Sequence, residues 1–175
     1  MSPLGIQLLG RPEIERDGRP AAPPRGAKAW AVLAYVLLSE QRVSRAHLAG
    51  LIFGDAGDPL GALRWTLAQL RKALGAPQAL AGDPLDVGLP AGTRVDVHAL
   101  GGPAPDPELA RGELLEGVEP GAGAVFEAWL LVERRRLGGL CEAVLRDAAL
   151  RALAHGDPLG AAALASRGLA LNQFD

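Results

Sequence analysis

The chain has 175 residues, of which 49% are hydrophobic, and its 18 basic and 20 acidic residues give a net charge of −2. This composition predicts a packed globular protein with one large domain or two small ones. A single cysteine, Cys141, excludes an internal disulfide, and three scattered histidines make a structural zinc site an unfavoured interpretation.

Basic residues are slightly concentrated in the first part of the chain. Residues 1–98 hold 11 basic and 9 acidic residues, whereas residues 99–175 hold 7 and 11. The asymmetry favours a nucleic-acid site in the first part. The N-terminus lacks the pattern of a signal peptide, and no apolar run reaches the length of a membrane span. We therefore expect a cytoplasmic protein without membrane contact.

Alternating apolar residues open the chain. Leu4, Ile6 and Leu8 predict a half-buried strand over residues 4–9. A short partner strand is expected over residues 13–16, and Asp17-Gly18 is a strong turn signal. The chain should therefore begin with a small antiparallel sheet.

Three helices are predicted next. Residues 28–39 are apolar nearly all round, which indicates a helix buried on several sides. Ser44 is a suitable N-cap for a second helix over residues 45–53. Asp58-Pro59 begins a third helix, which spans residues 59–74 and ends before a glycine.

The third helix has two distinct faces. Its leucines at positions 63, 67, 70 and 74 share one narrow face, which we expect to enter the core. Trp65 and Lys72 point the opposite way. An outward tryptophan is costly in water, so its position indicates a contact with DNA, with the neighbouring domain or with a partner subunit.

The rest of the chain divides into a predicted hairpin and helices. Residues 85–89 and 93–97 alternate around Pro90–Gly92, which predicts a β-hairpin over residues 85–97. Residues 101–107 have the composition of a linker. An apolar stripe then predicts a long helix that His155–Pro158 stops, followed by another helix over 159–171.

This order of elements resembles the winged helix-turn-helix of OmpR-type response regulators. The sequence Leu-Arg-Lys-Ala-Leu at 70–74 is similar to the end of that family's recognition helix. The segments 112–117 and 126–134 resemble the bacterial transcriptional activator domain, a tetratricopeptide-like module. Together the two halves resemble activators of the Streptomyces antibiotic regulatory protein (SARP) type.

The resemblance implies a mainly α fold with a small antiparallel sheet. A winged-helix DNA-binding domain would span residues 1–98, and a linker would follow at 99–107. An all-α tetratricopeptide-like domain would span residues 108–175. Because about three helical repeats are normally needed to bury their faces, we expect either a fragment of a longer protein or dimerisation through that end.

The resemblance also implies a DNA-binding site, with helix 59–74 in the major groove and hairpin 85–97 as the wing. In the family pattern the position of Gln69 reads bases, and that of Trp65 makes apolar base contacts. Glutamine can bond adenine in two places and arginine neutralises phosphate, so the chemistry is consistent. The positions of Thr66 and Arg71 reach phosphates, and Arg94 would act from the wing. The full candidate set is Arg64, Trp65, Thr66, Gln69, Arg71, Lys72 and Arg94.

A second hypothesis is a protein–protein scaffold that keeps the winged-helix shape without binding DNA. Family members usually carry basic residues at the positions of Ala68 and Gln69, so this helix has less positive charge, and the loop at 54–58 is acidic. A negative or neutral surface around Trp65 and Arg71 would favour the scaffold.

An enzymatic function has no support in the sequence, because no nucleophile–base pair, paired carboxylates or metal cluster occurs at a meaningful spacing. We expect no cofactor and no metal. Helical repeats need neighbours to bury their faces, and residues 172–175 resemble the opening of another repeat turn. The expected partners are duplex DNA and, through the helical domain, a protein partner or a second subunit in a homodimer.

Overall fold

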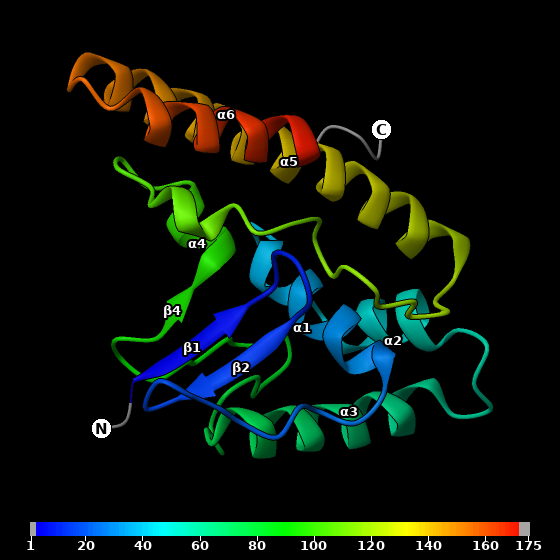
Figure 1. Cartoon of the computed structure of the whole chain (residues 1–175). Helices are drawn as coiled ribbons and strands as arrows, with labels where there is room; N and C mark the ends of the chain where they lie inside the picture. The colour runs from blue at the N-terminus through cyan, green and yellow to red at the C-terminus, as the bar shows by residue number, and fades with distance from the viewer. Residues whose placement is uncertain (1–2, 172–175) are drawn as a thin grey trace.

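Helices make up most of the regular structure and accompany one small sheet (Figure 1), so the predicted mainly α fold class is confirmed. The computed structural model describes residues 3–171. The strands are β1 (Leu4–Gln7), β2 (Glu13–Arg16), β3 (Arg19–Pro20) and β4 (Arg94–Val95). The helices are α1 (Ala27–Leu38), α2 (Arg45–Phe53), α3 (Pro59–Leu74), α4 (Asp96–Leu100), the short 3-10 helix η1 (Pro107–Leu109), α5 (Ala124–Ala154) and α6 (Pro158–Leu171).

The sheet has the strand order β3-β2-β1-β4. β1 and β2 are antiparallel with Ile6 opposite Ile14, as predicted. The predicted turn at Asp17-Gly18 brings a further strand, β3, antiparallel to β2. β4 lies parallel to β1, with Val95 beside Ile6. The sheet is therefore mixed rather than wholly antiparallel, and these buried apolar residues share the face that is turned toward the core.

Capping signals close to each helix set the ends of α2 and α3. The hydroxyl of Ser44 accepts a hydrogen bond of 3.2 Å from the amide of His47. The carboxylate of Asp58 accepts one of 2.8 Å from the amide of Gly61. Both bonds satisfy N–H groups that lack partners in the first helical turn. Gly75 ends α3 with a left-handed φ of 64°, which glycine adopts without strain.

The predicted β-hairpin over residues 85–97 is wrong. Residues 86–87 pair with 80–81, which precede them, and the backbones of Ala81 and Asp86 exchange hydrogen bonds of 3.1 and 2.7 Å. The second predicted strand joins the free edge of β1 as β4 and continues at once into α4. Alternation along one segment indicates a strand but does not identify the distant backbone with which it pairs.

A buried carboxylate fastens α4 to the end of β1. Oδ2 of Asp96 accepts hydrogen bonds of 2.8 Å from the amides of Leu8 and Leu9. Its Oδ1 accepts one of 2.7 Å from the amide of Val97. Burial raises the pKa of Asp96, and the three amide donors, with the positive charge of Arg111, offset only part of that effect.

The second half of the chain packs directly onto the first. Residues 113–116 bond to residues 8–10 through three backbone hydrogen bonds of 2.8, 2.8 and 3.0 Å. The ring of Phe126 in α5 is fully buried, and its centroid lies 6.5 Å from that of Tyr35 and 5.2 Å from that of Trp129. One continuous apolar core joins the two halves. The predicted division between domains at 98 and 108 stays a prediction.

The two last helices form a hairpin that breaks near Gly156, close to the predicted position. Figure 1 shows this hairpin on the side of the molecule opposite to α3. Within the predicted linker, α4 ends at residue 100 and η1 begins at 107, so only residues 101–106 lack helix. Residues 172–175, in which we predicted another repeat turn, lie outside the described residues. Between residues 3 and 171, no helix is both long and apolar enough to cross a membrane.

Candidate nucleic-acid interface

The inner face of α3 anchors the helix to the core. Its four leucines, predicted to share one face, are at most 2% exposed: Leu63, Leu67, Leu70 and Leu74. Residues three and four positions apart lie on the same side of a helix, so the opposite side is turned outward. Figure 1 shows that α3 runs along the lower edge of the molecule, where no other helix covers it from below.

The outward side of α3 carries the other candidate side chains. Trp65 is 53% exposed. Arg64 and Lys72 are exposed as well, and Gln69 is half-buried beside them. The structure therefore brings four of the seven predicted site residues together on one side of one helix.

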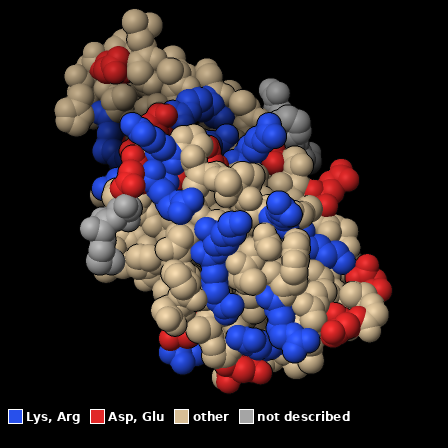
Figure 2. All heavy atoms as spheres, turned by 90° about the horizontal axis from the view of Figure 1, so that it is seen from below, with Lys and Arg blue, Asp and Glu red and all other residues tan. Residues whose placement is uncertain are grey.

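Basic side chains gather on this side of the molecule. Figure 2 views it from below and shows Lys and Arg over the middle of the face, with Asp and Glu mostly toward its margins. Exposed basic residues on α3 and on neighbouring segments are Arg16, Arg25, Arg64 and Lys72. The face of the molecule that carries α3 is thus basic over its middle, whereas the scaffold hypothesis expects a negative or neutral surface there.

The acids of the loop between α2 and α3 are paired with cations. Nζ of Lys28 lies 2.8 Å from Asp55, and this hydrogen bond lowers the pKa of the Asp55 carboxyl. Arg64 lies 3.7 Å from Asp58, in a solvent-exposed pair that contributes little stability. Their negative charge opposes the approach of a phosphate less than the sequence suggested.

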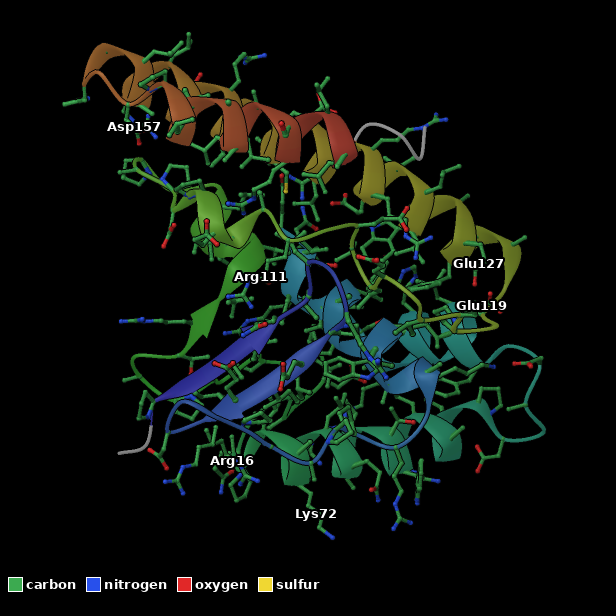
Figure 3. The ribbon with its side chains drawn as sticks, in the orientation of Figure 1. Arg16, Lys72, Arg111, Glu119, Glu127 and Asp157 are labelled. Atoms are coloured by element: carbon green, nitrogen blue, oxygen red, sulfur yellow. The ribbon has the colours of Figure 1, made fainter. Side chains whose placement is uncertain are left out.

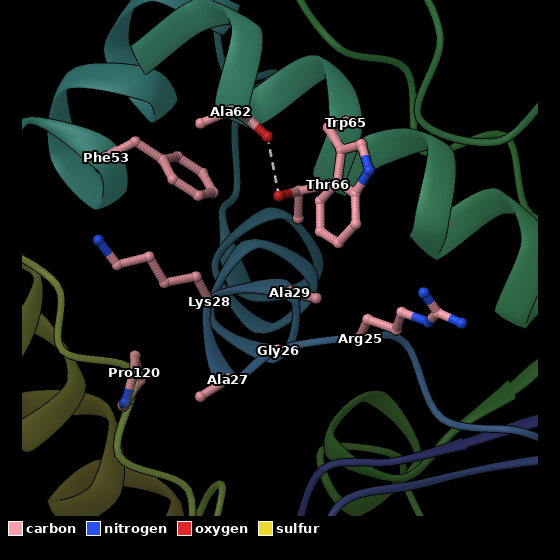
Figure 4. A pocket seen from close by; sticks show the side chains of 10 residues that line it. All are labelled: Arg25, Gly26, Ala27, Lys28, Ala29, Phe53, Ala62, Trp65, Thr66 and Pro120. Atoms are coloured by element: carbon pink, nitrogen blue, oxygen red, sulfur yellow. Dashed lines mark hydrogen bonds between the residues drawn. The ribbon is translucent and has the colours of Figure 1, made fainter. Parts of the chain in front are cut away.

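Trp65 lines a shallow groove between α3 and the start of α1. The groove has a volume of about 360 Å³, and its walls include Arg25, Lys28, Phe53 and, from the helical half, Pro120. Figure 4 shows the indole of Trp65 on the wall opposite Lys28, with Arg25 beside it. The side chain of Trp65 is therefore not buried against the second half of the chain, residues 108–171. No sequence pattern had pointed to Arg25 or Lys28, which approach Trp65 only through the packing of α1 on α3.

Thr66 does not lie on the outward side. It is 3% exposed, and its hydroxyl donates a hydrogen bond of 2.9 Å to the carbonyl of Ala62. The expected phosphate contact is not available to a hydroxyl in this position. Thr66 stands three residues after Leu63 and four before Leu70, so the helical period alone would have placed it on the inner face.

Arg71 supports the chain that follows α3. Its Nε donates to the carbonyl of Ala79 at 2.8 Å, and its Nη2 donates to that of Leu80 at 2.7 Å. The guanidinium is half-buried in this role and is not presented to a phosphate.

Arg94 is exposed on β4, which forms the edge of the sheet opposite β3 and lies apart from α3 in Figure 1. It pairs with Gly5 in the parallel register, and the next residue, Val95, points into the core with Ile6. Adjacent strand residues point to opposite faces, so Arg94 stands on the face turned away from the core. The structure brings neither Arg94 nor a wing hairpin to α3.

No family model matches the chain, and no curated protein matches it. Among solved structures, the chain is similar in fold to Mycobacterium tuberculosis EmbR in complex with a low-affinity phosphopeptide. That likeness has a TM-score of 0.53 and 21% sequence identity, and it covers 95% of this chain and 56% of that chain. This chain therefore spans just over half the length of the EmbR structure, and at this identity the likeness establishes the fold alone.

Proposed function

We propose that the chain is a transcriptional regulator that binds duplex DNA with α3 in the major groove. One observation carries the proposal: the outward side of α3 is uncovered and lies on the face where basic side chains gather. The major groove of B-DNA admits an α-helix, and each base pair presents a distinct pattern of donors and acceptors there.

Each outward residue has a chemical role in this arrangement. The amide of Gln69 can bond adenine in two places, and the exposed indole of Trp65 can contact a thymine methyl. Arg64 and Lys72 flank these residues and would neutralise phosphates. Thr66, Arg71 and Arg94 take no part in the proposed contact.

The sequence resemblance to SARP-type activators supports a regulatory role. The likeness in fold to EmbR, which covers 95% of this chain, supports the same proposal. We propose no catalytic activity and no cofactor, and we place the protein in the cytoplasm.

Titration of the purified chain against duplex DNA at several salt concentrations tests the proposal. Phosphate contacts release counterions, so the logarithm of the association constant should fall linearly with the logarithm of salt concentration. An affinity that does not change with salt, or no binding at low salt, would favour the scaffold hypothesis instead.

The helical half carries a separate proposed contact. Arg167 is the only charged residue of α6, and it turns inward, where it pairs with Glu108 and donates to the carbonyl of Pro107 at 3.0 Å. The outward side of α6 therefore has no charge and exposes Leu159 and Leu169. Two such faces would meet without like-charge repulsion, so we propose a second copy of this chain as the partner.

A further inference from the structure

The turn between β2 and β3 sets two arginines side by side. Asp17 and Gly18 form it with positive φ angles of 56° and 68°, as in two-residue hairpin turns that match the twist of strands. Arg16 and Arg19 are direct partners across the turn, so their side chains project from the same face of the sheet. That face also buries Ile14, two residues before Arg16. Both arginines are exposed.

Arg16 reaches the C-terminal end of α3. A Cβ atom on Gly75 would lie only 2.9 Å from Nη1 of Arg16, so the guanidinium lies over the helix end. Figure 3 shows Arg16 beside this end of α3, with Lys72 pointing away from the molecule on its lower side. Cations from two separate elements therefore converge at one end of the proposed recognition helix.

These cations are not neutralised by acids. Within residues 3–171, no carboxylate forms an ion pair with Arg16, Arg19 or Lys72. Asp17 is the only acid of the turn. A cation near a helix C-terminus interacts favourably with the helix dipole, so Arg16 stabilises α3 and has a structural role. That role does not explain Arg19, which lies on the edge strand.

We propose that the β2–β3 turn is a second DNA-contacting element, in which Arg16 and Arg19 bind phosphates beside the groove that holds α3. The inference rests on the proposed DNA binding by α3. The planar guanidinium matches the geometry of phosphate oxygens and binds them through paired N–H donors. Such contacts fix the orientation of α3 without reading sequence. The N-terminal sheet thus supplies a backbone contact that the absent hairpin at 85–97 cannot supply.

The double variant Arg16→Ala/Arg19→Ala tests this contact. The logarithm of the association constant falls with the logarithm of salt concentration, and this slope should become less negative by about 1.8, because each lost phosphate contact removes about 0.9 from its magnitude. Affinity should fall alike for all duplex sequences. The matched control Arg146→Ala/Arg151→Ala removes two exposed arginines from α5, on the opposite side of the molecule, and should leave the slope unchanged.

The variant Asp17→Asn gives a second measurement that does not remove the arginines. Asparagine tolerates the left-handed backbone conformation, so the turn should persist and the melting temperature should stay the same. Loss of the negative charge should raise affinity for duplex DNA at low salt, and the gain should shrink as salt screens the charges. This variant decides the question if the double variant fails to fold.

The outcomes separate the inference from the proposed function. Wild-type protein that shows no salt-dependent binding to duplex DNA would overturn the proposed function itself. Wild-type protein that binds, together with a folded Arg16→Ala/Arg19→Ala variant of unchanged slope, would overturn the turn contact alone. An Asp17→Asn variant whose affinity does not rise at low salt would also overturn the turn contact.

Discussion

Arg71 and Leu80 are joined across the turn that follows α3, because Nη2 of the arginine donates to the leucine carbonyl over 2.7 Å. Nε of Arg71 donates to the carbonyl of Ala79 at 2.8 Å. A guanidinium held by two carbonyls is engaged within the protein, whereas the next side chain, Lys72, is exposed. We therefore expect two adjacent cations of one helix to differ, with Arg71 acting in stability and Lys72 in the proposed DNA contact.

Arg71→Ala should lower the free energy of unfolding by about 1–3 kcal/mol, since it leaves two carbonyl acceptors without their donors. Lys72→Ala should change that free energy by less than about 0.5 kcal/mol, because the side chain is exposed. Urea unfolding measures both. For DNA binding, Lys72→Ala should have the larger effect of the two. It should reduce the magnitude of the slope of the logarithm of the association constant against the logarithm of salt concentration by about 0.9. A folded Arg71→Ala variant should keep the wild-type slope. A slope of smaller magnitude in that variant would mean that Arg71 does contact a phosphate.

Gln69→Ala should relax selectivity at one base pair. Loss of a bidentate contact to adenine should reduce discrimination there by about 1–3 kcal/mol, with little change at other positions. A duplex selected from a random library and its single-base variants provide the measurement. Gln78→Ala removes an exposed glutamine just beyond α3 and serves as the matched control. Unchanged selectivity at every position in Gln69→Ala would show that the helix is docked in another register.

The parts of the fold that the sequence predicted well are those that depend on neighbouring residues. Asp58 and Gly75 mark the ends of α3 because a cap acts on amides or carbonyls within one turn. The leucine stripe identified the inner face for the same reason. Asp17-Gly18 likewise predicted the turn between β2 and β3, since the whole turn lies within a few residues.

Contacts between distant segments could not be predicted in this way. β4 pairs with β1 across almost ninety positions of sequence, and the sequence near residue 94 does not identify that partner. Arg71 binds carbonyls whose position depends on the turn after α3. Arg16 lies beside the end of α3 because of the way the sheet packs, which the local sequence does not predict. Its pairing with Arg19 across the turn could have been predicted from Asp17-Gly18. Thr66 was assigned to the site by resemblance, against the helical period that buries it.

Lowering the pH should increase the contribution of Asp96 to the free energy of unfolding. Burial raises its pKa in the folded protein, so the folded state holds the proton more tightly than the unfolded state does. The resulting stability is fully present below the ordinary pKa of an aspartate and is lost as pH rises through the raised value. Asparagine cannot titrate, and in Asp96→Asn its NH2 group would face the amide of Val97.

The destabilisation caused by Asp96→Asn should therefore be larger near pH 4 than near pH 7. Urea unfolding of both proteins at the two pH values measures the difference. Glu40→Gln, which changes an exposed acid, is the control for general effects of charge. A destabilisation that shrinks as pH falls would mean that the three amide donors outweigh burial, and that the pKa of Asp96 is lowered instead.

The outward side of α6 should control self-association. Leu159 and Leu169 are 83% and 68% exposed, and no charged side chain of α6 shares that side. Their burial against a second copy would remove apolar surface from water, whereas Leu159→Glu/Leu169→Glu would place carboxylates in the contact. Sedimentation across a concentration series should show dimerisation of the wild type and a monomeric double variant. Val132→Glu adds a carboxylate to an exposed position of α5 and should still dimerise. A wild type that stays monomeric throughout would remove the second copy as the partner of α6, without bearing on whether α3 binds DNA.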